Sequence, residues 1–340
     1  MYINFVIFFL IFSFIFSYFC KKKNFIVDFK LEKHKRFTSK LKSNSVGGIF
    51  LIIFFVYEFL FLKSNNILFL FLSSLFIIGF MSDIKKLNNV GFRFFLQILT
   101  IIIFSKIIGL EIQTTKIAFI DKILSNNYIN IFFVTFCLMV LINGSNFIDG
   151  LNGLLLKYYI LIYLVLFFYF GQNEFVDEIF LLNLLIILTI LLFLNLSGYI
   201  YMGDSGAYLL SLFSGVYLIN FALNNIFISP YFIIVLLWYP CFELLFSMIR
   251  RFKYKSKTYK PDSLHLHQFI YNFIRFKIKN DGLICHLITS LSINFYNLII
   301  FIIAKNFIYN SEILISILFL NIIFYLLLYN FLKKNYKVNN

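Results

Sequence analysis

An aspartate between two glycines opens one of the apolar stretches of this chain, in the segment GDSG at 203–206. A carboxylate at a helix start can cap the helix by accepting hydrogen bonds from the first free N–H groups. The same geometry can serve a ligand, with Asp204 holding Mg²⁺ while the free N–H groups face an anion such as a diphosphate. Gly203 and Gly206 would let the backbone approach that ligand closely. The segment is a candidate site for a metal ion and a phosphate group.

A second polar cluster is NGSNFIDGLNGLL, at 143–155, which carries three asparagines, an aspartate and three glycines. Spacings of three place Asn146, Asp149 and Asn152 along one side of a helix end. A polar contact between helices is one explanation, because small residues permit close packing. That contact accounts for the glycines but not for the grouped Asn and Asp side chains. The cluster therefore favours a site for a polar ligand.

Two further clusters are weaker when each is taken alone. Asp83 follows Ser82 at the end of an apolar stretch, where a charged residue is ordinary. His265 and His267 alternate in a basic segment, without the third and fourth ligands that a zinc site needs. They belong either to an exposed loop or to a site where imidazoles touch phosphate oxygens.

The chain that holds these clusters is strongly apolar. Of its 340 residues 61% are hydrophobic and 13% charged, and the mean hydropathy is +0.90. Apolar runs of roughly 17–25 residues recur, each long enough to cross a bilayer core of ~30 Å as a helix. The polar residues are too few to form a water-facing shell. We therefore expect an all-α, polytopic integral membrane protein, with 1–340 forming one domain.

Eleven spans are expected, and most connections between them are short. We expect the first to be an anchor helix with its N-terminus outside. A cleaved signal peptide would carry positive charge before its apolar run and a small-residue cleavage site after it, and neither is seen here. The expected spans are 2–20, 47–62, 67–81, 92–110, 128–143, 155–171, 179–198, 206–224, 229–248, 284–304 and 312–332. The loops that alternation places in the cytoplasm are 21–45, 82–91, 144–154, 199–205 and 249–283.

The placement of the basic residues supports this orientation. The formal net charge is +15, and Lys and Arg concentrate in the loops 21–45 and 249–283, as the positive-inside rule requires of cytoplasmic loops. Nucleic-acid binding is a poor alternative, because no basic module stands apart from the spans. All four polar clusters fall on the same cytoplasmic side. Since ionisable groups at membrane depth are costly and usually face a cavity or one another, the clusters predict one site.

Taken in order, six segments resemble the polyprenyl-phosphate N-acetylhexosamine-1-phosphate transferases of glycosyltransferase family 4. That family includes the enzymes that initiate O-antigen, enterobacterial common antigen and teichoic-acid synthesis, with phospho-MurNAc-pentapeptide transferase as a distant relative. The segments are SVGGIFL (45–51), GFMSD (79–83), NGSNFIDGLNGLL (143–155), GDSGAYLLSL (203–212), YPCFELLFSMIRR (239–251) and KPDSLHLHQFIY (260–271).

The resemblance implies a Mg²⁺-dependent reaction, with Mn²⁺ as a substitute, at a bacterial inner membrane. Undecaprenyl phosphate would attack the β-phosphorus of a UDP-N-acetylhexosamine on the cytoplasmic face, releasing UMP. Membrane lipids surround such an enzyme, and a homodimer is also implied. The residues implied in catalysis are Asp83, Asp149 and Asp204, the last two as metal ligands. Those implied in substrate binding are Asn143, Asn146, Asn152, Gly206, Lys260, His265 and His267.

One departure from the family pattern concerns the acidic pair that ends in Asp83. Ser82 stands where the first acid is expected. A lipid phosphate has a second pKa of about 6 and is largely dianionic near pH 7, so an acid acting as a base there need not be obligatory. Two alternatives stay open: a catalytically impaired relative, and a transporter with a polar substrate site.

Overall fold

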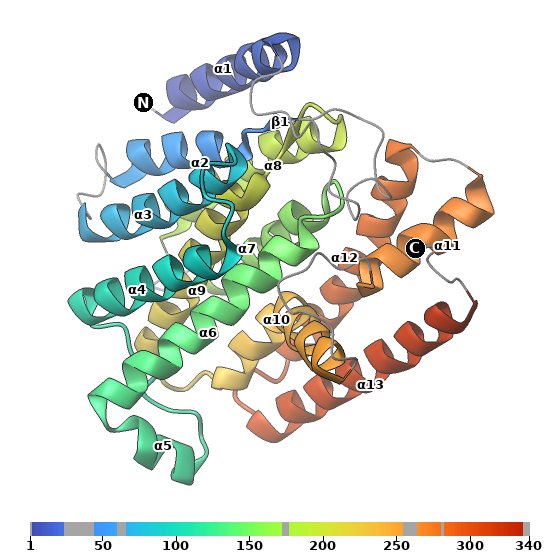
Figure 1. Cartoon of the computed structure of the whole chain (residues 1–340). Coiled ribbons are helices and arrows are strands. Elements are labelled where there is room, and N and C mark those ends of the chain that lie inside the picture. The colour runs from blue at the N-terminus through green and yellow to red at the C-terminus, as the bar shows by residue number, and fades with distance from the viewer. Residues whose placement is uncertain are drawn as a thin grey trace.

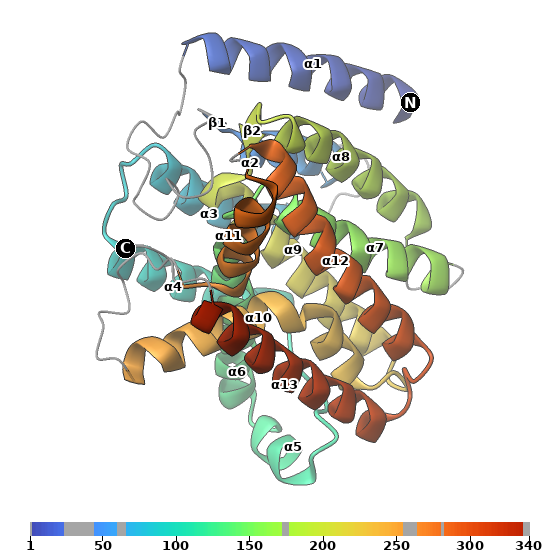
Figure 2. The ribbon, with the colours of Figure 1, turned by 90° about the vertical axis from the view of Figure 1, so that its right-hand side faces the viewer.

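The structure, a computed structural model, describes residues 2–23, 44–59, 66–171, 177–253, 264–279 and 282–335. Nearly all regular elements are helices, and two short strands pair in parallel. The elements are α1 (Tyr2–Lys23), β1 (Asn44–Ser45), α2 (Gly47–Val56), α3 (Asn66–Asp83), α4 (Val90–Ile108), α5 (Ala118–Leu124), α6 (Asn127–Ile148), α7 (Leu154–Phe170), α8 (Glu178–Leu196), β2 (Ile200–Tyr201), α9 (Gly203–Asn224), α10 (Pro230–Lys253), α11 (Leu266–Ile278), α12 (Leu283–Lys305) and α13 (Ser311–Asn335). Figures 1 and 2 show the long helices side by side, with α1 and α13 at opposite edges of the bundle.

Nine helices of the described part are long and apolar enough to cross a membrane. Two shorter apolar helices, Gly47–Phe59 and Leu154–Phe170, coincide with two more of the expected spans. The structure thus agrees with the expected all-α membrane protein, while the number eleven and the orientation stay predictions. The sequence did not predict α5 or α11. Within the expected loop 249–283, α10 continues to Lys253 and the short helix α11 forms at Leu266–Ile278, so the placement of this loop stays a prediction.

Helix α9 lies at the centre of the bundle and is the most deeply buried of the candidate spans. It packs against α2, α3 and α6. Glycines allow the closest approaches: a Cβ on Gly79 of α3 would lie 2.5 Å from Ser205 Cα, and one on Gly206 would lie 3.0 Å from Gly48 N of α2. Both of these contacts are near the start of α9, so the packing brings the end of α3 and the start of α2 to that point.

The two short strands fix the segments that lead into α2 and α9. Asn44 pairs with Ile200 and Ser45 with Tyr201. The N–H of Gly48 then donates to the carbonyl of Met202 at 3.2 Å. The entry to α9 is therefore held by backbone hydrogen bonds before its first turn begins.

A proline inside α10 shapes the helix that carries the YPCFELLFSMIRR segment. Pro240 has no N–H to donate to the carbonyl of Leu236, which would otherwise lack its helical partner. The hydroxyl of Tyr158 on α7 donates to that carbonyl at 2.8 Å. Gly144 of α6 packs directly against the backbone of Pro240. The proline is thus accommodated by neighbouring helices, as membrane interiors require of a freed carbonyl.

Candidate active site

The N-terminus of α9 is capped by a residue from another helix. Asp83, the last residue of α3, accepts hydrogen bonds from Asp204 N at 2.8 Å, Ser205 N at 3.0 Å and Ser205 Oγ at 2.6 Å. Gly203 has φ +71°, and a Cβ there would lie 2.8 Å from both carboxylate oxygens of Asp83. The glycine is required both by its backbone conformation and by the space that the Asp83 carboxylate fills.

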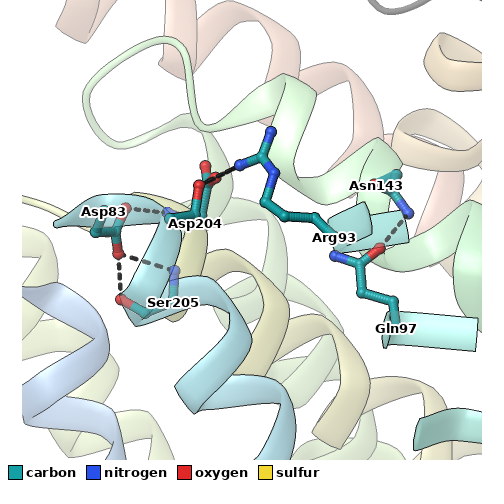
Figure 3. Close-up of polar contacts among 7 residues, drawn as sticks. Asp83, Arg93, Gln97, Asn143, Asp204 and Ser205 are labelled. Atoms are coloured by element: carbon teal, nitrogen blue, oxygen red, sulfur yellow. Dashed lines mark hydrogen bonds and ion pairs between the residues drawn. The ribbon is translucent and has the colours of Figure 1, made fainter. Parts of the chain in front are cut away.

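Asp204 does not cap the helix whose first turn it occupies, so that interpretation of the GDSG segment is wrong. Its Oδ2 accepts a hydrogen bond from Ser82 Oγ at 2.6 Å and pairs with Arg93 Nη1 at 2.5 Å. The same Nη1 also contacts the hydroxyl of Ser82. Oδ1 of Asp204 accepts no hydrogen bond from any residue in the described ranges. Figure 3 shows Asp83 on one side of the α9 start and Arg93 on the other.

The third carboxylate of the group comes from the end of α6. Asp149 follows the last residue of that helix, and its Oδ2 accepts the N–H of Gly203 at 3.2 Å. Asp83, Asp149 and Asp204 therefore surround the first turn of α9, although they lie far apart in the sequence. The positive end of the α9 dipole and its free N–H groups favour negative charge at this place.

The asparagines of the second cluster divide into two groups. Asn143 and Asn146 are half-buried on α6, and Asn143 Nδ2 donates to Gln97 Oε1 at 3.3 Å and to Met139 O at 2.9 Å. Gln97 lies one turn after Arg93 on α4, so both side chains reach the face of α4 toward the site (Figure 3).

Asn152 has a different place from the one expected. The prediction that it continues the side of the helix marked by Asn146 and Asp149 is wrong, because α6 ends at Ile148 and a turn follows. Asn152 is 2% exposed, and its Nδ2 donates to Asn195 O at 2.7 Å while its N–H donates to His286 Nδ1 at 3.1 Å. In this structure it ties the turn to α8 and α12.

The two histidines of the fourth cluster are buried, and the exposed-loop interpretation is wrong. His265 stands just before α11, and its Nδ1 lies 2.9 Å from Oε1 of the fully buried Glu243. The ring of His267 is parallel to that of His265, with centroids 5.4 Å apart. Neither ring nitrogen of His267 has a hydrogen-bond partner among the described residues. Burial, opposed in part by Glu243, lowers the pKa of His267 to about 3, so its ring is neutral at pH 7.

This histidine segment packs against the end of α6. The ring of Phe147 lies 4.9 Å from the ring of His265 and also lies under the guanidinium of Arg251, at 5.7 Å. A Cβ on Gly150 would lie 3.5 Å from His267 Nε2. The histidines are thus next to the loop that carries Asp149. All four polar clusters meet at one end of the bundle, while Lys260 lies outside the described residues.

The fit of a divalent cation depends on how many carboxylates lie at the start of α9. No group of three His, Cys, Asp or Glu side chains able to hold a metal ion occurs in the described ranges. Both oxygens of Asp83 are engaged by the start of α9. Mg²⁺ usually takes one or two carboxylates and completes its shell with water and substrate phosphates. Asp204, through Oδ1, and Asp149 fit that smaller donor set.

Three polar residues near these clusters were not predicted from the sequence as parts of the site. Arg93, Gln97 and Glu243 all lie within apolar stretches, and Gln97 and Glu243 are at most 1% exposed. An ionisable residue inside a transmembrane segment is in itself a signal of function. That signal was available for Arg93 and Glu243, each the sole charged residue over more than ten positions of its span.

The fold and the site define a membrane-embedded protein with an acidic group at a helix N-terminus. Residues 65–222 match the family described as Glycosyl transferase family 4. The matched segment contains Asp83, Asp149 and Asp204. The match confirms the resemblance to this family of transferases that the motifs indicated. The histidine segment lies beyond the matched residues. No curated protein matches the chain.

Proposed function

We propose that the protein transfers a sugar-1-phosphate from a UDP-N-acetylhexosamine to undecaprenyl phosphate. A lipid phosphate oxygen forms a bond to the β-phosphorus of the donor, and the bond from that phosphorus to the bridging oxygen breaks. UMP leaves with the bridging oxygen, and the lipid retains a diphospho-sugar. The product would begin an O-antigen, capsule or other envelope polysaccharide.

The observation that carries this proposal is the meeting of three carboxylates and Arg93 at the N-terminus of α9. The lipid acceptor stays in the bilayer, so an enzyme that uses it needs its polar groups at the end of an apolar bundle. Here Asp83 closes α3, Asp149 follows α6 and Asp204 begins α9, which places all three at one end. Basic loops on that side would attract the anionic donor and lipid headgroups.

Each group has a part in bringing two anionic phosphates together. Mg²⁺ or Mn²⁺ held by Asp204 and Asp149 would supply positive charge between the phosphates. Arg93 adds a fixed cation, and the α9 N-terminus adds a dipole of the same sign. Asn143 and Asn146 supply amide groups for the nucleotide-sugar. Asp83 orders the first turn of α9 by accepting three hydrogen bonds from Asp204 and Ser205.

The proposed location is chosen to suit the donor. A bacterial inner membrane and a site facing the cytoplasm suit a UDP-sugar donor, which is soluble. The transporter alternative needs polar groups near the midplane, whereas the acids here gather at helix ends. Cysteines placed at positions 149 and 204 should react with a water-soluble thiol reagent from the cytoplasmic side of sealed vesicles.

The test is UMP release by the purified protein with undecaprenyl phosphate, Mg²⁺ and a panel of UDP-N-acetylhexosamines. We expect release that needs both the lipid and the metal, and that disappears in Asp204→Asn. The panel would also name the sugar. If the folded protein and a Ser82→Asp variant both release no UMP from any donor, a non-catalytic relative is the better conclusion.

A further inference from the structure

Arg93 holds Asp204 through a single nitrogen and leaves other donors unused. Nη1 serves both Asp204 Oδ2 and Ser82 Oγ, whereas a guanidinium carries five N–H donors. Its Nε is buried without a hydrogen-bond partner among the described residues. The ion pair is therefore one-point, not the two-point fork that makes arginine–carboxylate pairs strong.

The position of Arg93 on its own helix also needs an explanation. It lies in the first turn of α4, where the helix dipole disfavours a cation. Asn89 already caps that helix by accepting the N–H of Phe92 at 3.1 Å. Arg93 thus does not stabilise the start of α4. Any favourable interaction of this residue must come from the groups that its guanidinium contacts.

The ion pair is only partly buried. Both side chains of the ion pair are 19% exposed. The neighbour at position 82 is a neutral serine, so a single carboxylate neutralises Arg93. In Figure 3 the side chain reaches from α4 to Asp204, with Gln97 and Asn143 beside its base. A phosphate group that reached the guanidinium would meet donors that no described residue uses.

We infer that Arg93 binds the diphosphate of the nucleotide-sugar, and that Asp204 and the diphosphate compete for its guanidinium. Without donor, Asp204 holds the arginine in place. When the donor enters, two phosphates offer a forked partner with more charge than one carboxylate oxygen, and Arg93 turns to them. Asp204 is then released from its ion pair. This inference rests on the proposed function, because it takes a UDP-sugar as the ligand.

The competition makes an unusual prediction about binding in the absence of metal. UDP binding would be measured calorimetrically on the full-length protein in detergent with EDTA present. Arg93→Gln should weaken UDP binding about tenfold or more, as expected for the loss of a charge-assisted hydrogen bond. Arg93→Lys, which keeps the charge, should weaken it less. Asp204→Asn should tighten metal-free binding, because the arginine is no longer held.

Two comparisons separate this role from general effects. Lys86→Gln removes one positive charge from an exposed position three residues after Asp83, and it should leave UDP affinity nearly unchanged. In the double variant Arg93→Gln/Asp204→Asn, the Asp204→Asn change should no longer increase the affinity for UDP. The unfolding temperature of each variant in detergent shows whether it is folded.

The outcomes are distinct. If the wild-type protein binds UDP and Arg93→Gln binds it equally well, the inference is overturned while the proposed donor stands. Weaker metal-free binding by Asp204→Asn would also overturn it. If the wild-type protein binds no UDP, with or without Mg²⁺, the donor named in the proposed function fails, and the inference fails with it.

Discussion

The carboxylate of Asp83 accepts the backbone N–H of Asp204 at 2.8 Å, so one acid of the site holds the peptide that carries another. The same carboxylate takes Ser205 N and Ser205 Oγ. Helix α3 therefore ends on the first turn of α9, and the Asp204 side chain is free to face Arg93. Asp83 thus fixes the backbone that carries the Asp204 side chain.

This relationship predicts a loss of stability when Asp83 is replaced. Asp83→Ala should destabilise the protein by about 0.5–2 kcal/mol, the usual cost of losing a helix cap, and Asp83→Asn should cost less because its amide oxygen still accepts. Thermal unfolding in detergent measures whether Asp83→Ala loses more stability than Asp83→Asn. Ser205→Ala, which removes only one of the three hydrogen bonds, is the matched control. Equal unfolding temperatures for wild type and Asp83→Ala would contradict the capping role.

Replacing Glu243 should destabilise the protein more than replacing any single one of its hydrogen-bond partners. Its carboxylate is fully buried and accepts from Leu266 N at 3.3 Å and Tyr325 Oη at 2.9 Å, besides its contact with His265. Glu243→Ala removes the partner of His265 and Leu266 at the start of α11 and of Tyr325 on α13 at once. We expect a cost of several kcal/mol, since each buried donor left unsatisfied costs roughly 1–3 kcal/mol.

Tyr325→Phe provides the comparison for that experiment. It removes one hydrogen bond and leaves the others, so a cost of ~1–3 kcal/mol is expected. Both variants would be followed by chemical unfolding in detergent. A Tyr325→Phe variant as unstable as Glu243→Ala would show that the carboxylate is not the centre of this network.

Much of the arrangement could be predicted from the sequence because membrane helices follow from hydropathy. The polar clusters were recognisable as breaks in apolar stretches, and the expectation that they meet at one end of the bundle agrees with the structure. The role of Asp83 was not predictable, because its partners are more than 120 positions away and the choice depends on how α3 packs on α9. Asn152 was misplaced because spacing alone cannot tell where α6 ends.

The buried imidazole of His267 predicts how stability changes with pH. Its pKa is lowered to about 3 in the folded protein, against about 6.5 in an unfolded chain. Between these values the unfolded chain binds more protons, so stability falls as the pH drops below about 6.5, by up to ~1.4 kcal/mol per pH unit. Above that range this group has no effect.

A substitution isolates the contribution of this histidine from other acid effects. His267→Gln cannot titrate, so its unfolding free energy should fall less than that of the wild type between pH 7.5 and pH 5. Unfolding midpoints in detergent at several pH values give the comparison. Parallel pH curves for the two proteins would mean that His267 is not neutral and buried in solution.

Ser82 offers the last prediction, because its hydroxyl lies between Arg93 and Asp204 Oδ2. Ser82→Asp would replace a donor to Asp204 with a second carboxylate beside the same guanidinium. The added negative charge should strengthen cation binding: two unit charges 4 Å apart interact by ~1 kcal/mol in water, which is roughly fivefold in affinity. The Mg²⁺ concentration for half-maximal UMP release should therefore fall by about that factor. Ser82→Asn, which adds no charge, should leave it unchanged. A rise in maximal release with no change in the Mg²⁺ requirement would instead point to a natural protein that is impaired by its serine.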